Sequence, residues 1–169
     1  NIKRAADYEE ILSTELKRVY KLVYELCPVK EIVDLMSTKY KYHNIKVLLK
    51  GKFLEKDLSN MLIDLGREDL NELKRKIDTD NFRDLKGNVE KAVLEVISDF
   101  EANKDPQKID IIVDRYMFKE LDEIKKSLNY KFTDKLVNAM IDSTNVRTLL
   151  RVKKQGKGRE FASEVLVTG

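Results

Sequence analysis

The segment at residues 44–52 reads NIKVLLKGK, and the segment at residues 145–153 reads NVRTLLRVK, 101 residues later. Both begin with Asn, a β-branched aliphatic residue and a basic residue. After one further residue, both continue with Leu-Leu and a second basic residue, and after one more residue both end with Lys. We call them the first motif and the second motif. Their recurrence indicates that the chain contains one structural unit twice.

Each motif has two sides when it is placed on a helix of about 3.6 residues per turn. The aliphatic residues share one face, and two cations four residues apart lie together beside it. In the first motif these are Ile45, Leu48 and Leu49 with Lys46 and Lys50, and in the second they are Val146, Leu149 and Leu150 with Arg147 and Arg151. We therefore expect both apolar faces to be held against a core and both cation pairs to be presented along an edge.

The composition favours helices in the rest of the chain as well. Its 169 residues include only two prolines and six glycines, no Trp, and 42% hydrophobic residues, which is enough for a core. Apolar residues recur at three- and four-residue steps from Ile11 to Cys27, where Pro28 ends the helix, and again from Val29 into the first motif.

The second half repeats this layout. Asp105 followed by Pro106 predicts a helix start, the helix stops near Asn129, and a final helix runs into the second motif. Shorter helices are expected at residues 57–63, 69–77 and 88–102, separated by Gly66, by residues 78–81 and by Gly87. The sequence thus predicts an all-α, multi-lobed protein with two pseudo-symmetric helical lobes, at residues 1–104 and 105–169, the second incomplete.

The positive charge is concentrated in the two motif regions. The chain has 33 basic and 30 acidic residues, but residues 35–54 hold five cations and residues 145–159 hold six, with no acid in either stretch. Cations near a helix C-terminus can simply complement its dipole and aid solubility. Because two such pairs match, a docking surface for an anionic or carbonyl-rich partner is as well supported as this explanation. A nucleic-acid-binding module is the alternative, although few aromatic residues interleave with these cations.

Three segments together resemble a known family. They are KYKYHNIKVLLKGK at residues 39–52, DRYMFKELDEIKKSL at residues 114–128 and DSTNVRTLLRVKKQGK at residues 142–157. In this order they resemble the C subunits of the prokaryotic V-type (A-type) ATP synthases, which are related to the d subunits of vacuolar proton pumps (vacuolar ATPases). Many members carry Asp-Tyr where this chain has Lys41-Tyr42, so an acidic contact is not expected there, and Asp142 occupies the matching place in the second copy.

The resemblance implies an all-helical funnel of three similar lobes. It sits on the cytoplasmic face of the membrane proteolipid ring as a peripheral part of the membrane-bound complex, receives the central-stalk rotor subunits, and has no catalytic role, cofactor or small-molecule substrate. This chain then corresponds to two of the lobes, and its lack of an initiator Met is expected of a piece of a longer protein. We predict that the partner-binding residues are Asn44, Lys46, Lys50, Asn145, Arg147, Arg151, Lys153 and Lys154.

Enzymatic readings find little support in the residues. Cys27 lies on an apolar helical stripe, which predicts a small core residue, and the single His43 is expected to make a structural hydrogen bond. One His and one Cys cannot form a zinc set. The DTDN segment at residues 78–81 predicts a turn, and the glycines at 156 and 158 lack the strand and the Lys-Ser/Thr of a P-loop.

Overall fold

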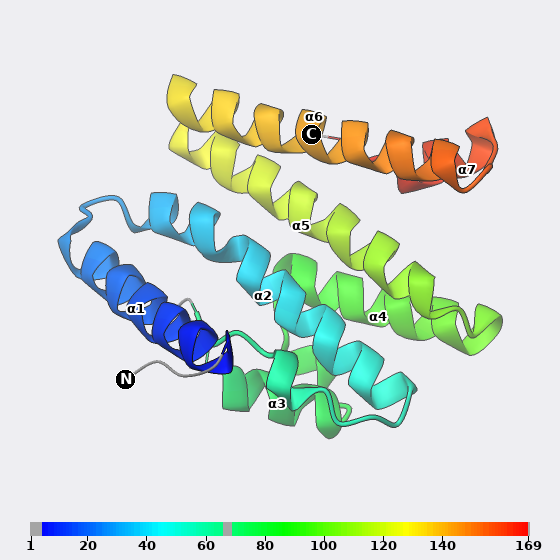
Figure 1. Ribbon diagram of the computed structural model, residues 1–169, viewed down its shortest axis with the longest axis horizontal. Helices are drawn as coiled ribbons and strands as arrows, with labels where there is room; N and C mark the ends of the chain where they lie inside the picture. The colour runs from blue at the N-terminus through cyan, green and yellow to red at the C-terminus, as the bar shows by residue number, and fades with distance from the viewer. Residues whose placement is uncertain (1–4, 66–68, 169) are drawn as a thin grey trace.

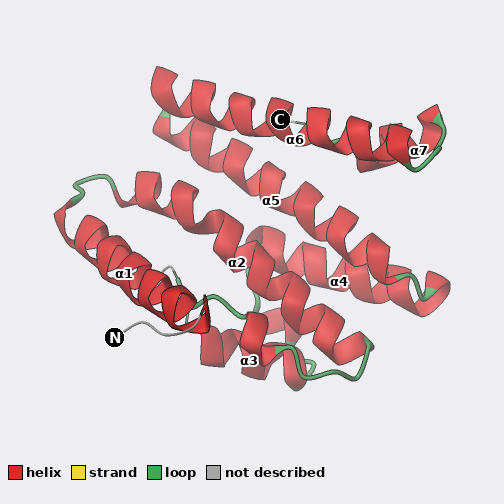
Figure 2. Cartoon of the chain, in the orientation of Figure 1, coloured by secondary structure: helices red, strands yellow, loops and turns green. Residues whose placement is uncertain are grey.

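The computed structural model describes residues 5–65 and 69–168, and every regular element in them is helical (Figure 2). The all-α prediction is therefore confirmed. The elements in chain order are α1 (Ala5–Leu26), α2 (Lys30–Phe53), the 3-10 helix η1 (Ser59–Met61), α3 (Leu70–Asp78), the 3-10 helix η2 (Phe82–Asp84), α4 (Gly87–Asn103), α5 (Pro106–Leu128), α6 (Lys131–Lys154) and α7 (Arg159–Val165).

Local signals set the main helix boundaries as predicted. Pro28 lies between α1 and α2. The Asp105 carboxylate accepts a hydrogen bond of 2.9 Å from the Gln107 amide and caps α5, with Pro106 in its first turn. Asn129 ends α5 in the left-handed conformation, at a φ of 52°.

The expected helix at residues 57–63 is wrong, because only the three residues of η1 are helical there. The Asp57 carboxylate accepts a hydrogen bond from the Ser59 amide, and such local side-chain bonds compete with a regular helix. The chain then becomes extended at Leu62, at φ −71° and ψ 140°. The predicted separator at Gly66 lies outside the described residues.

The long helices lie side by side in the order α1, α2, α5, α6, with α4 also against α5 and with α3 beneath α2 (Figure 1). The main core cluster is formed by apolar residues of α2, α3, α4 and α5, including Leu49, Val93 and Val113. A smaller cluster joins α5 to α6 through Leu121 and Val137. Because α5 contributes to both clusters, packing is continuous across residue 105, and the division into two lobes stays a prediction.

Candidate partner-binding site

The two asparagines that open the motifs hold equivalent places in the structure. The Asn44 side chain donates to the Ile63 carbonyl at 2.7 Å and accepts from the Ile63 amide at 2.8 Å. The Asn145 side chain donates to the Val167 carbonyl at 2.9 Å and accepts from the Val167 amide at 3.0 Å. In each motif, the side-chain amide of the Asn therefore binds both the backbone N–H and the backbone C=O of one later residue. These two bonds hold the chain that follows the motif against the motif helix.

The backbone before each fastened residue also matches. Leu62 has φ −71° and ψ 140°, and Leu166 has φ −74° and ψ 140°. The helices α2 and α6 both have 24 residues and end in the same way. The backbone N–H of the capping residue, Leu54 or Gln155, donates to the carbonyls four and two residues earlier. The sequence repeat thus corresponds to a repeated local structure. The polar groups of both asparagines thus have a structural role within the chain, and their predicted role toward a partner stays a prediction.

The apolar faces of the two motifs have different environments. Ile45, Leu48 and Leu49 are 0%, 8% and 0% exposed and belong to the main core, as predicted. Their counterparts Val146, Leu149 and Leu150 are 57%, 45% and 63% exposed. The expectation that the second apolar face is held against the core is therefore wrong for this chain, because no described element covers that side of α6.

The cation pair of the first motif joins two helices. Lys46 lies 2.5 Å from the Asp114 carboxylate, and Lys50 lies 2.6 Å from the Asp110 carboxylate, so α2 is bridged to α5 at two successive turns. One turn and a half earlier on α2, Lys41 pairs with Glu120, which also accepts a hydrogen bond of 2.7 Å from the Tyr42 hydroxyl. Lys46 and Lys50, which we expected to be presented along an edge, are therefore ion-paired within the chain, and partner binding by these residues stays a prediction.

The sequence reasoning missed the acidic partners on α5. Asp110, Asp114 and Glu120 follow one another at steps of four and six residues, which brings them to neighbouring positions on one side of a helix. The steps of five and four residues between Lys41, Lys46 and Lys50 are close to these, so the two sets can pair when the helices run antiparallel. The signal was therefore present, but nothing local indicates which helix faces which.

The cations of the second motif stay open to solvent. Arg147 donates to the Ser143 carbonyl and hydroxyl on its own helix, and Arg151, Lys153 and Lys154 are exposed. Within residues 5–65 and 69–168, none of these four cations takes part in an ion pair with a carboxylate. The exposed cations of the predicted site therefore all lie on α6.

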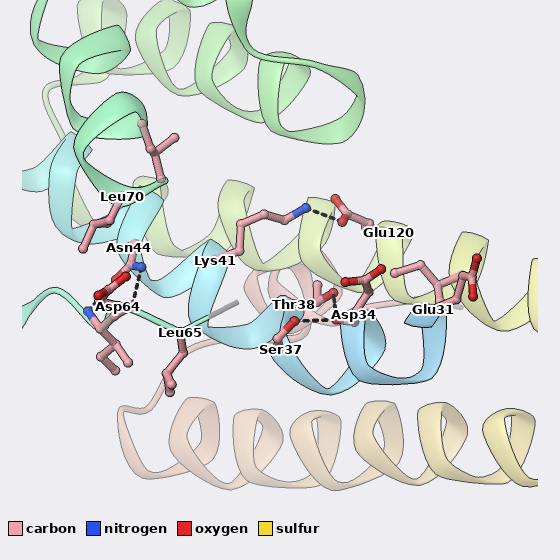
Figure 3. Close-up of a pocket in the computed structure, with 13 residues that line it drawn as sticks. Glu31, Asp34, Ser37, Thr38, Lys41, Asn44, Asp64, Leu65, Leu70 and Glu120 are labelled. Carbon is pink, nitrogen blue, oxygen red and sulfur yellow. Dashed lines mark hydrogen bonds and ion pairs between the residues drawn. The ribbon is translucent and has the colours of Figure 1, made fainter. Parts of the chain in front are cut away.

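A pocket of about 320 Å³ lies beside the first motif, between α2, α5 and the residues around Asp64 (Figure 3). Lys41 points across it to Glu120, and the Ser37 and Thr38 hydroxyls donate to the Asp34 carbonyl. Asn44 at its edge is bound to Ile63. Several polar groups that line the pocket thus bond within the chain. The described residues bring together no group of three His, Cys, Asp or Glu side chains suited to a metal ion.

The remaining candidates have structural roles. His43 donates from Nε2 to the Met61 carbonyl at 2.9 Å, which confirms the predicted structural hydrogen bond. Cys27 is half-buried, and its thiol lies 3.2 Å from the Val29 carbonyl at the junction of α1 and α2. Asp78 ends α3, and residues 79–81 form the turn after it, where Asp80 pairs with Lys52.

Comparison with known proteins defines the family to which this helical chain belongs. The profile of the ATP synthase (C/AC39) subunit family matches residues 2–169, so the chain belongs to this family. Over 160 residues it is 30% identical to a protein of Enterococcus hirae that is named as the C subunit of a V-type sodium ATPase. That alignment covers 95% of this chain and 49% of the relative, so the chain spans about half the length of the relative. No solved structure matches the chain.

Proposed function

We propose that the chain acts as a noncatalytic subunit of a V-type ATP synthase or ATPase, in the central rotor, where it joins the central stalk to the membrane proteolipid ring and so couples rotation to proton or sodium transport. The match of the family profile to residues 2–169 carries this proposal. The name of the Enterococcus relative, as the C subunit of a V-type sodium ATPase, supports it.

The packing of the helices suits a part that transmits torque. The helices α2, α5 and α6 have 24, 23 and 24 residues, and α5 lies between the other two and packs against both (Figure 1). Close-packed interiors have low compressibility and pass strain on with little loss. The ion pairs between α2 and α5 link these two helices, so that they resist sliding past each other. Such a part transmits force and needs no catalytic residues.

The surface toward the ring is proposed at the basic end of α6. Lys153 and Lys154 are exposed in the last turn of this helix, where they also complement the helix dipole. Loop carboxylates or lipid phosphates at the cytoplasmic face of the ring would suit them. Among the described residues, no helix combines the length and hydrophobicity that a membrane crossing requires.

The division at residues 104 and 105 belongs to the same proposal. Two similar units arranged about one axis present similar groups to successive copies of one ring protein. The matching bonds of Asn44 to Ile63 and of Asn145 to Val167 support this proposal.

The test is co-purification of the full-length natural polypeptide with the detergent-solubilised ring. We expect the ring to be retained, and retention to fall when Lys153 and Lys154 are changed to Glu. The double variant of Lys131 and Lys135 to Glu, at the other end of α6, is the matched control and should retain the ring. No retention by the natural polypeptide would contradict the proposal. Tight, salt-sensitive binding to random duplex DNA would favour a nucleic-acid-binding module instead.

A further inference from the structure

The turn between α6 and α7 has the same backbone structure as the turn that follows α2. After α2, the Lys56 amide donates to the carbonyl five residues earlier at 2.9 Å, and after α6 the Lys157 amide does so at 3.1 Å. The residue before each donor is left-handed, with a φ of 52° at Glu55 and of 66° at Gly156. Both turns therefore close their helices with the same motif, 101 residues apart.

The side chains on this shared backbone are different. In the first turn, Phe53 stacks on Phe100 with the ring centroids 4.3 Å apart, and the acids Glu55 and Asp57 follow. The positions of Phe53, Glu55, Asp57 and Leu58 are taken in the second turn by Lys154, Gly156, Gly158 and Arg159. Each of these four changes removes an acid or adds a cation. We call residues 153–159 the basic turn; its cations are Lys153, Lys154, Lys157 and Arg159.

The first turn uses its charge within the chain, and the basic turn does not. Lys52, which corresponds to Lys153, lies 2.7 Å from the Asp80 carboxylate and donates to the Ile77 carbonyl at 2.7 Å. Across residues 5–65 and 69–168, no carboxylate forms an ion pair with a cation of the basic turn. Even with Glu160 counted, four cations against one acid leave an excess of three positive charges.

The basic turn is also accessible. All its residues except the buried Val152 just before it are exposed, and it lies at one end of the molecule, where α6 meets α7 (Figure 1). A Cβ atom at Gly158 would meet nothing within 4 Å, and its φ of −77° suits any residue. Neither packing nor backbone conformation requires glycine there, but glycine does allow a close approach to the backbone from outside.

We propose that the basic turn binds the phosphate-bearing headgroups of an anionic membrane surface. Three of its four cations are lysines, which act as flexible point charges, whereas bidentate recognition of a single carboxylate favours arginine. Interface cores between proteins are also poor in lysine. An anionic lipid surface needs no fixed geometry and attracts each nearby cation separately. This inference rests on the proposed function, which puts the chain next to a membrane.

The first experiment is vesicle flotation of the full-length natural polypeptide. Vesicles of phosphatidylcholine with added phosphatidylglycerol should bind it, and vesicles of phosphatidylcholine alone should bind it far more weakly. Lys154→Gln/Lys157→Gln should weaken binding to the anionic vesicles about tenfold or more, since one cation near such a surface is worth about fivefold. Added salt should weaken binding of the natural protein.

Two further variants make the result specific to the basic turn. Lys131→Gln/Lys135→Gln removes the same charge from exposed positions at the other end of α6 and should bind as the natural protein does. Gly158→Asp restores the acid that the first turn has at Asp57 and should weaken binding about fivefold. Circular dichroism shows whether each variant is folded. An equal loss in both lysine variants, or no loss at Gly158→Asp, would overturn the proposal.

The second experiment locates the contact on the 169-residue chain. In a Cys27→Ser background, which removes the single cysteine, a fluorophore is attached at Gln155→Cys or at Tyr130→Cys. Both positions are exposed, and they lie about 35 Å apart along α6. A quencher on the lipid headgroups should reduce the fluorescence at Gln155→Cys much more. Equal quenching, or stronger quenching at Tyr130→Cys, would contradict contact through the basic turn.

These outcomes are separate from those of the proposed function. Ring retention in detergent together with equal binding to both kinds of vesicle would overturn this inference alone, and would assign the basic turn to carboxylates of the ring. Binding to anionic vesicles through the basic turn without ring retention would support this inference and contradict the rotor role.

Discussion

Replacement of Asn44 by alanine should destabilise the chain more than the same change at the other motif asparagine. Asn44 is 4% exposed and makes two hydrogen bonds to the backbone of Ile63, of 2.7 and 2.8 Å. An unpaired buried polar group costs about 1–3 kcal/mol. Because Ile63 is half-buried and water can regain part of this, we expect a total loss of about 2–4 kcal/mol in the free energy of unfolding. That is a large share of the roughly 5–15 kcal/mol of a typical domain.

Urea denaturation followed by circular dichroism measures the effect, with Asn145→Ala as the matched control. Asn145 makes the same two bonds to Val167 but is more exposed, so its loss should cost about 1–2 kcal/mol. The unfolding slope should stay unchanged in both variants. The reasoning is refuted if Asn44→Ala unfolds at the same urea concentration as the natural chain, or if Asn145→Ala proves the more damaging change.

Three further predictions concern burial, backbone conformation and pH. Ile45→Ala should cost about 2–4 kcal/mol in thermal or urea unfolding, whereas Val146→Ala should stay within about 0.5 kcal/mol, because only Ile45 is buried; equal losses would contradict the observed contrast. Lys104 ends α4 at a φ of 54°, which favours glycine, so Lys104→Gly should raise the free energy of unfolding by about 1 kcal/mol. A lower melting temperature of this variant would count against the prediction. Hydrogen bonds from Lys125 and the lysine after it lower the pKa of Asp122 from 3.8. Its stabilising contribution is complete above the unfolded-state pKa and is lost as the pH falls through the folded-state pKa. The stability advantage over Asp122→Asn should therefore shrink below a pH of about 4, and an advantage that grows on acidification would refute the assignment.

The helical layout could be predicted because its signals are local. Pro28, the Asp105–Pro106 pair and the stop at Asn129 each act through the backbone of their own residues, and the structure places helix ends at all three. The repeated motif could also be recognised from sequence, since its residues keep one helical register in both copies.

The environment of the motif cations could not be predicted in the same way. Whether Lys46 and Lys50 face solvent or a carboxylate depends on the helix packed beside them, which begins more than fifty residues later. The exposure of Val146 and Leu150 has the same cause, because the pattern shows that a face is apolar but not what covers it. For Asn44 and Asn145, a polar residue at the border of an apolar face was the available signal, and their bonds to distant backbone follow only from the fold.

The proposed position of this polypeptide, between a proteolipid ring and a central shaft, is the most direct test of the central claim. An electron-microscopy map of the purified membrane complex should show density for α2, α5 and α6 between the proteolipid ring and the central shaft, in contact with both. Density for these helices on the catalytic head or on the stationary peripheral stalk, or their absence from the purified complex, would contradict the rotor-adaptor role.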